Sequence, residues 1–133
     1  MGATTTARLT VQQFHELPLP DEEDYELVRG EIVRMAKAKF KHETVKSNFL
    51  EELVGYNLNM RVGKVYSETM YDLTDEDAVI PDVSVMLGSR PAGVDLEGYP
   101  QGAPDTVVEV VSSEQAAKLE ERISLYLRTG AKW

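Results

Sequence analysis

The sequence contains no cysteine, so its 133 residues can form neither a disulfide framework nor a thiolate metal site. It also lacks an apolar run long enough to cross a membrane as a helix. The first ten residues carry no apolar h-region, which predicts a protein without a secretory signal. These absences argue against disulfide-rich scaffolds, thiolate-zinc modules and membrane proteins. They fit a cytoplasmic protein.

Positive charge is scarce in this chain. Fourteen Lys and Arg residues face 23 Asp and Glu residues, for a net charge of −9. Such an excess of negative charge argues against broad electrostatic binding of a nucleic-acid backbone. The one basic concentration lies in residues 34–46, which contain Arg34, Lys37, Lys39, Lys41, His42 and Lys46. It reads either as a solvated loop and helix start or as the basic side of a nucleic-acid enzyme.

A length of 133 residues predicts one domain over residues 1–133, and 42% apolar and 28% charged residues are ordinary for a globular protein. Helical spacing marks residues 11–17, 42–60 and 114–128. Strand patterns mark residues 25–35 (a hairpin turning at Arg29-Gly30), 65–73, 82–87 and 105–111. The fold class is therefore α/β (α+β). The chain stops at Trp133, where another strand is expected, which predicts truncation at the C-terminus.

Burial can be predicted for the longer elements. The stripe expected to be buried in helix 42–60 consists of Val45, Phe49, Leu50, Leu53, Val54 and Leu58. The corresponding stripe in helix 114–128 consists of Ala116, Leu119, Ile123, Tyr126 and Leu127. The nearly continuous apolar run at 105–111 predicts a central strand buried on both faces. Acidic residues 75–77 predict a loop, and residues 88–104, rich in Gly and Pro, predict an irregular excursion beside a site.

Two acidic residues interrupt apolar runs that read as strands. Asp82 lies within Ile80–Leu87, and Glu109 lies within Thr106–Ser112. A carboxylate among β-branched residues is costly to bury without a partner. Mg²⁺ and Mn²⁺ prefer oxygen ligands, and Mg²⁺ usually takes one or two carboxylates with waters and substrate phosphate. If the two strands are neighbours, these residues can hold such an ion. Otherwise, Asp82 caps a turn and Glu109 forms a structural ion pair.

The helix that follows Glu109 carries two candidate cations, Lys118 and Arg122. Helical geometry places Arg122 beside Tyr126, at the edge of the expected buried stripe, and Lys118 one turn earlier and nearer to solvent. Arg122 is therefore better placed to reach inward. Lys118 is the better proton-transfer group, because an arginine stays protonated.

Several blocks, in this order, resemble the Uma2 family (also called DUF820), described as restriction-endonuclease-like proteins with the PD-(D/E)XK nuclease fold. The matching blocks are residues 25–33, His42 at a helix start, residues 81–85, residues 104–112, residues 122–126 and Gly130. The resemblance implies a mixed β-sheet flanked by helices and a Mg²⁺-dependent phosphodiesterase site acting on DNA. It also implies that Asp82 and Glu109 bind the metal.

The resemblance has departures at the site. Many PD-(D/E)XK enzymes carry a lysine two residues after the second acid, where this chain has Val111. Uma2 sequences instead place that lysine four residues before a tyrosine, which here is Arg122, and Lys118 stands where the family often has Asp. Either Lys118 has taken over the lysine role by a one-turn shift, or the site is weakened or dead.

Two further residues match family positions, and each has two alternative interpretations. Glu26 is either an accessory acid near the metal or a partner in an ion pair on the strand face. His42, at a helix start, is either a capping residue or a phosphate contact.

The leading prediction is an endonuclease that hydrolyses DNA phosphodiester bonds with Mg²⁺ or Mn²⁺. Its catalytic residues are Asp82, Glu109, Lys118 and Arg122, of which Asp82 and Glu109 bind the metal. One alternative is an inactive nuclease-fold module that binds nucleic acid or a protein partner. Another is purely structural, with Glu109 and Asp82 ion-paired to Arg122 and Lys118. A missing final strand would leave apolar surface exposed, which hints at a homodimer.

Overall fold

The strands of this protein form two antiparallel sheets rather than one. The computed structural model describes residues 8–88 and 96–133. The first sheet has the order β2-β1-β5-β4, formed by β1 (Tyr25–Val28), β2 (Glu31–Arg34), β4 (Tyr71–Thr74) and β5 (Asp77–Val79). The second has the order β3-β6-β7, formed by β3 (Gly63–Ser67), β6 (Val83–Leu87) and β7 (Thr106–Val108). All pairings between the named strands are antiparallel, and an isolated bridge between Asp72 and Gln101 is parallel.

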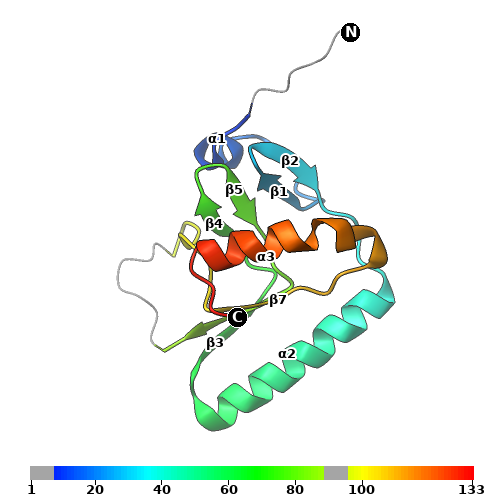
Figure 1. Cartoon of the computed structure of the whole chain (residues 1–133), viewed down its shortest axis with the longest axis vertical. Helices are drawn as coiled ribbons and strands as arrows, with labels where there is room; N and C mark the ends of the chain where they lie inside the picture. Colours follow the sequence, from blue (N-terminus) through cyan, green and yellow to red (C-terminus); the bar gives the residue numbers. More distant parts are fainter. Residues whose placement is uncertain (1–7, 89–95) are drawn as a thin grey trace.

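The helices surround these sheets, and the α+β class is confirmed. They are α1 (Val11–His15), α2 (Phe40–Met60) and α3 (Leu119–Arg128), with a 3₁₀ helix η1 (Ser113–Lys118) leading into α3. Figure 1 shows α3 crossing the middle of the molecule, with α1 near the first sheet and α2 running along the side of β3. No helix in the described part of the chain is both long and apolar enough to span a membrane.

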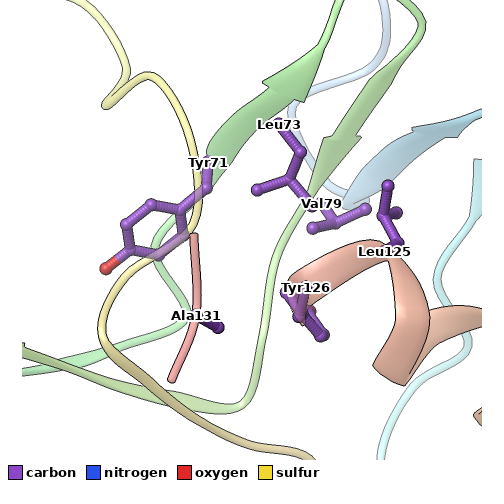
Figure 2. Packing of buried hydrophobic residues seen from close by; sticks show 6 residues of the cluster. All are labelled: Tyr71, Leu73, Val79, Leu125, Tyr126 and Ala131. Atoms are coloured by element: carbon purple, nitrogen blue, oxygen red, sulfur yellow. The ribbon is translucent and has the colours of Figure 1, made fainter. Parts of the chain in front are cut away.

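One apolar cluster fixes α3 against the first sheet. It comprises Tyr71, Leu73, Val79, Leu125, Tyr126 and Ala131, which come from β4, β5, α3 and the segment after α3 (Figure 2). A second cluster packs α1 on β1 and β5, through Val11, Phe14, Leu27 and Ala78. Because Leu125 and Tyr126 are buried, Arg122, one turn before Tyr126, is held on the inner side of α3.

Local sequence signals account for several elements. Thr10 and Gln13 form a reciprocal capping box at the start of α1. Arg29 and Gly30 both have positive φ, 52° and 77°, as the tight turn between β1 and β2 requires. Gly63 is needed in β3, because a Cβ there would lie 2.0 Å from the carbonyl oxygen of Met86 on the neighbouring strand.

One strand prediction and one loop prediction are wrong in the region 65–79. The strand expected over residues 65–73 is divided into β3 and β4, because Glu68 adopts a left-handed conformation with φ of 53°. The loop expected at 75–77 is shorter, since Asp77 begins β5. Its carboxylate accepts hydrogen bonds from the Arg29 amide at 2.9 Å and the Thr74 hydroxyl at 2.6 Å. These bonds stabilise a tight turn that charge alone does not predict.

The buried faces of the long helices also differ from expectation. In α2 the buried residue is Lys46, whose ammonium contacts Glu43 and Glu68, whereas Phe49, Val54 and Leu58 are exposed. The cause is tertiary, since α2 packs mainly along β3 and leaves much of its apolar surface open. In α3, Leu125 and Tyr126 are buried, while Ile123 and Leu127 are 47% and 52% exposed.

The central strand expected over 105–111 is instead the short edge strand β7, and its residues are only half-buried. Its outer side meets the last residues of the sequence. The Trp133 amide donates to Asp105 at 3.2 Å, and the Val107 amide donates to the Trp133 carbonyl at 3.0 Å, a parallel pattern. The irregular excursion expected at 88–104 falls partly on residues 89–95, outside the described residues; residues 96–104 hold no helix or strand.

Candidate active site

The pairing of β6 with β7 brings Asp82 and Glu109 together. Val83 pairs with Val108, and the same register continued by one residue sets Asp82 opposite Glu109. Residues directly opposite on antiparallel strands project to the same face, so like charges there repel one another. The Val110 amide, next to Glu109, donates to Asp82 Oδ2 at 2.7 Å and ties the two segments together. This arrangement concentrates negative charge on one side of the sheet.

In each of these carboxylates, one of the two oxygens makes all the contacts with the protein. Glu109 Oε1 accepts from the Tyr126 hydroxyl at 2.7 Å and lies 3.4 Å from Arg122 Nη2. Asp82 Oδ2 takes the Val110 amide and lies 3.5 Å from His42 Nε2. Asp82 Oδ1 and Glu109 Oε2 have no hydrogen-bond or ion-pair partner within residues 8–88 and 96–133. The side chains are 16% and 22% exposed, so solvent ions can reach them.

This donor set fits a hard divalent cation. Two carboxylate oxygens without partners are the kind and number of protein ligands that Mg²⁺ often takes, with water and phosphate completing the shell. No group of three or more His, Asp and Glu side chains placed to hold a metal is found among the described residues. The pair therefore suits an ion that keeps much of its own hydration.

Arg122 joins this pair to the first sheet. Its guanidinium forms two hydrogen bonds with Glu26 of β1, at 3.0 and 2.6 Å, and it lies over the Tyr126 ring at 5.5 Å. Glu26 also accepts from the Ile80 amide at 2.6 Å. Glu26 is thus a partner in an ion pair, and its partner is Arg122. This ion pair fixes one positive charge between Glu26 and Glu109.

Electrostatics set the protonation states of these groups. Burial raises the pKa of Glu109, and the charge of Arg122 and the hydrogen bond from Tyr126 offset only part of that rise. Burial by itself lowers the pKa of Arg122, but the hydrogen bonds to Glu26 and the nearby carboxylates outweigh it, so the pKa is raised. Burial raises the pKa of Tyr126 as well. Arg122 thus stays charged and Tyr126 stays a hydrogen-bond donor.

The two predicted cations lie in different environments. Arg122 is brought to Glu109, whereas Lys118 is exposed at the end of η1. The described residues show no ion pair between Lys118 and Asp82 or Glu109. Of the purely structural alternative, the Glu109–Arg122 contact is present, and His42 rather than Lys118 lies beside Asp82.

Some site residues were outside the predicted catalytic set. The sequence placed Tyr126 in a buried stripe and used it to locate Arg122, and it left His42 open as a capping residue or a phosphate contact. In the structure the Tyr126 hydroxyl holds Glu109, and His42 reaches Asp82 while its buried Nδ1 has no hydrogen-bond partner. The available signal was helical position, since Tyr126 lies one turn after Arg122 on the same face.

A small cavity opens onto this site. It has a volume of about 220 Å³ and is lined by Glu109, Arg122 and Tyr126 together with apolar residues of β7, α3 and the segment after α3. A larger cavity, of about 610 Å³, lies between α1 and β4 and contains none of these residues. The chemistry of the carboxylate pair, rather than cavity size, identifies the candidate site.

The raised pKa of Glu109 predicts how stability depends on pH. Between the ordinary carboxyl pKa and the raised one, the folded protein binds more protons than the unfolded chain, so the free energy of unfolding falls as pH rises. Without divalent metal, Glu109→Gln should unfold at a higher temperature than the wild type at about pH 8, and the difference should shrink towards about pH 4. Thermal denaturation across this range measures it. Glu120→Gln, an exposed change on α3, is the control. Equal or lower stability of Glu109→Gln at the higher pH would contradict the prediction.

Comparisons with known proteins place the chain. A protein from Anabaena variabilis ATCC 29413, described as a putative nuclease belonging to DUF820, has a similar structure. The TM-score is 0.78 at 24% identity, over 93% of this chain and 70% of that one, which shows a shared fold. Among curated proteins none matches significantly. The sequence profile of Uma2, described as "Putative restriction endonuclease", matches residues 11–132. This match spans nearly all of the sequence, and the chain therefore belongs to the Uma2 family.

Proposed function

We propose that this protein is a metal-dependent nuclease that hydrolyses DNA phosphodiester bonds at the Asp82–Glu109 pair. The observation that carries the proposal is the proximity of two like charges, each with one oxygen free of protein partners within the described residues. Asp82 raises the pKa of Glu109 by charge repulsion, in addition to the larger effect of burial, and a divalent cation bound between the two carboxylates would relieve that repulsion. The description of the family as restriction endonucleases supports the same reaction class.

The protein groups around the pair would orient it. A bound Mg²⁺ or Mn²⁺ supplies a Lewis acid for the phosphate and a water of lowered pKa. Asp82 Oδ1 and Glu109 Oε2 would bind the ion, because the other oxygen of each carboxylate is engaged by Val110 and Tyr126. Hydrogen bonds of this kind fix the direction of ligand oxygens and typically matter 10–100-fold in affinity or activity.

Arg122 would stabilise negative charge on the phosphate. Its raised pKa excludes it as a general base, but its guanidinium is held 3.4 Å from Glu109 and stays positive throughout the pH range of the reaction. Lys118 keeps a place in the proposal as an exposed cation one turn before Arg122, within reach of a longer substrate. In this assignment neither Lys118 nor Arg122 needs to transfer a proton.

Cleavage of labelled duplex DNA tests the proposal. The wild type should cut only with Mg²⁺ or Mn²⁺. Asp82→Asn and Glu109→Gln should each lose at least about 100-fold in rate, because even partners that only orient metal ligands matter 10–100-fold. Glu120→Gln, which changes an exposed carboxylate on α3, is the matched control and should cut as the wild type does. Metal-independent cleavage, or cleavage that survives either substitution, would contradict the assignment.

One observation favours a second candidate function, an inactive nuclease-fold module that binds nucleic acid or a protein partner. The Arg122 guanidinium, at the position of the family's lysine, is occupied by its two hydrogen bonds to Glu26. This alternative predicts that the wild type does not cut DNA and that Arg122→Lys restores metal-dependent cleavage. Arg128→Lys, an exposed change on the same helix, is the control. Wild-type cleavage that Arg122→Lys slows would exclude the alternative.

A further inference from the structure

We infer that three lysines before and at the start of α2 bind the backbone phosphates of the nucleic acid. The lysine segment (residues 37–41) contains Lys37, Lys39 and Lys41. It connects β2 to α2, and α2 begins at Phe40. The inference rests on the proposed function, because it takes nucleic acid as the substrate, and it adds the surface along which that substrate lies.

The lysine segment carries concentrated positive charge that the protein itself does not neutralise. Residues 35–42 contain no acidic residue, although the chain as a whole has a net charge of −9. Lys37, Lys39 and Lys41 are exposed, and none of their side chains makes an ion pair or hydrogen bond within the part of the chain that the structure describes. By contrast, Arg34 and Lys46, on either side, pair with Glu23 and Glu43.

The lysine segment also adjoins the candidate active site. His42 follows Lys41 directly, and its Nε2 lies 3.5 Å from Asp82 Oδ2. The opposite end of α2 is remote, because a helix of 21 residues is about 30 Å long. Figure 1 shows this difference: the start of α2 lies near the connection that follows β7, and its end lies near the start of β3. A strand of nucleic acid whose phosphate sits at Asp82 would therefore pass the lysines.

The three lysines would contribute an electrostatic, salt-dependent part of the affinity for nucleic acid. Lysines that contact phosphates release counterions, so affinity falls with salt by a slope of about 0.9 per phosphate neutralised on duplex DNA. Phosphate contacts carry no base information, so the contribution should be independent of sequence. Acidic surface elsewhere repels the nucleic acid, and the lysine segment would thus set the orientation in which the substrate approaches the carboxylate pair.

A charge-matched pair of triple variants tests the inference. One is Lys37→Gln/Lys39→Gln/Lys41→Gln. The control is Arg61→Gln/Lys64→Gln/Arg128→Gln, which removes the same charge from exposed positions after α2 and at the end of α3. Fluorescence anisotropy with labelled duplex DNA in EDTA measures affinity across a salt series without metal-dependent cleavage. Thermal denaturation checks that both variants fold as the wild type does.

The lysine variant should bind at least about 10-fold more weakly at low salt, with a salt slope smaller by about 0.9 for each lysine that contacts a phosphate. The control should stay within about twofold of the wild type, because its charges lie away from the bound strand. Equal losses in both variants, or no binding by the wild type, would overturn the inference. A loss confined to the lysine variant in a protein that never cuts DNA would uphold it while refuting the nuclease proposal. Unchanged binding in a protein that does cut would do the reverse.

Discussion

A single guanidinium links the two sheets of this protein. Arg122 of α3 forms a two-pronged hydrogen bond with Glu26 of the first sheet and also reaches Glu109, which follows the last strand of the second. Leu125 and Tyr126 anchor α3 in the core one turn further on, so the guanidinium is not free to move away. Breaking a buried ion pair by removing one partner typically costs about 3–5 kcal/mol. The geometry of the site therefore depends on the docking of α3.

The candidate site places two carboxylates close together, an arrangement that is unfavourable for the stability of the fold. Asp82 and Glu109 lie at adjoining ends of the β6–β7 pairing, and burial raises the pKa of Glu109 despite the nearby arginine. Each carboxylate has one oxygen without a protein partner in the described part of the chain, and the side chains are exposed enough for an ion to reach them. Repulsion and incomplete pairing together are what a divalent cation would relieve, and such perturbed groups cluster at functional sites.

The positions of several residues of the candidate site could be predicted from the sequence, because the relevant signals are local. Two acids in apolar runs marked neighbouring strands, and the helical repeat correctly ranked Arg122 above Lys118 as the residue that reaches inward. The hydrogen bond from Tyr126 to Glu109 and the pairing of Glu26 with Arg122 could not be derived in this way. The first bond joins residues that are 17 positions apart in the sequence, and the second joins residues that are 96 positions apart. Only the packed fold brings these side chains together.

The failures have a common cause in tertiary packing. A left-handed Glu68 divides one predicted strand, and the exposed apolar side of α2 reflects the narrow sheet beneath it rather than helical periodicity. Strand β7 reads as central because it is apolar, yet it lies at an edge. Pattern identifies what kind of element a segment forms, whereas the partners available to that element decide which of its faces are covered.

Calorimetric titration of the purified protein with Mn²⁺, beside Asp82→Asn and Glu120→Gln, tests the central claim most directly. The wild type and Glu120→Gln should bind the ion at one class of site, and Asp82→Asn should lose that binding, because Asp82 would supply one of the two protein ligands. Binding that is equal in all three proteins, or absent from the wild type, would contradict a metal site at the Asp82–Glu109 pair.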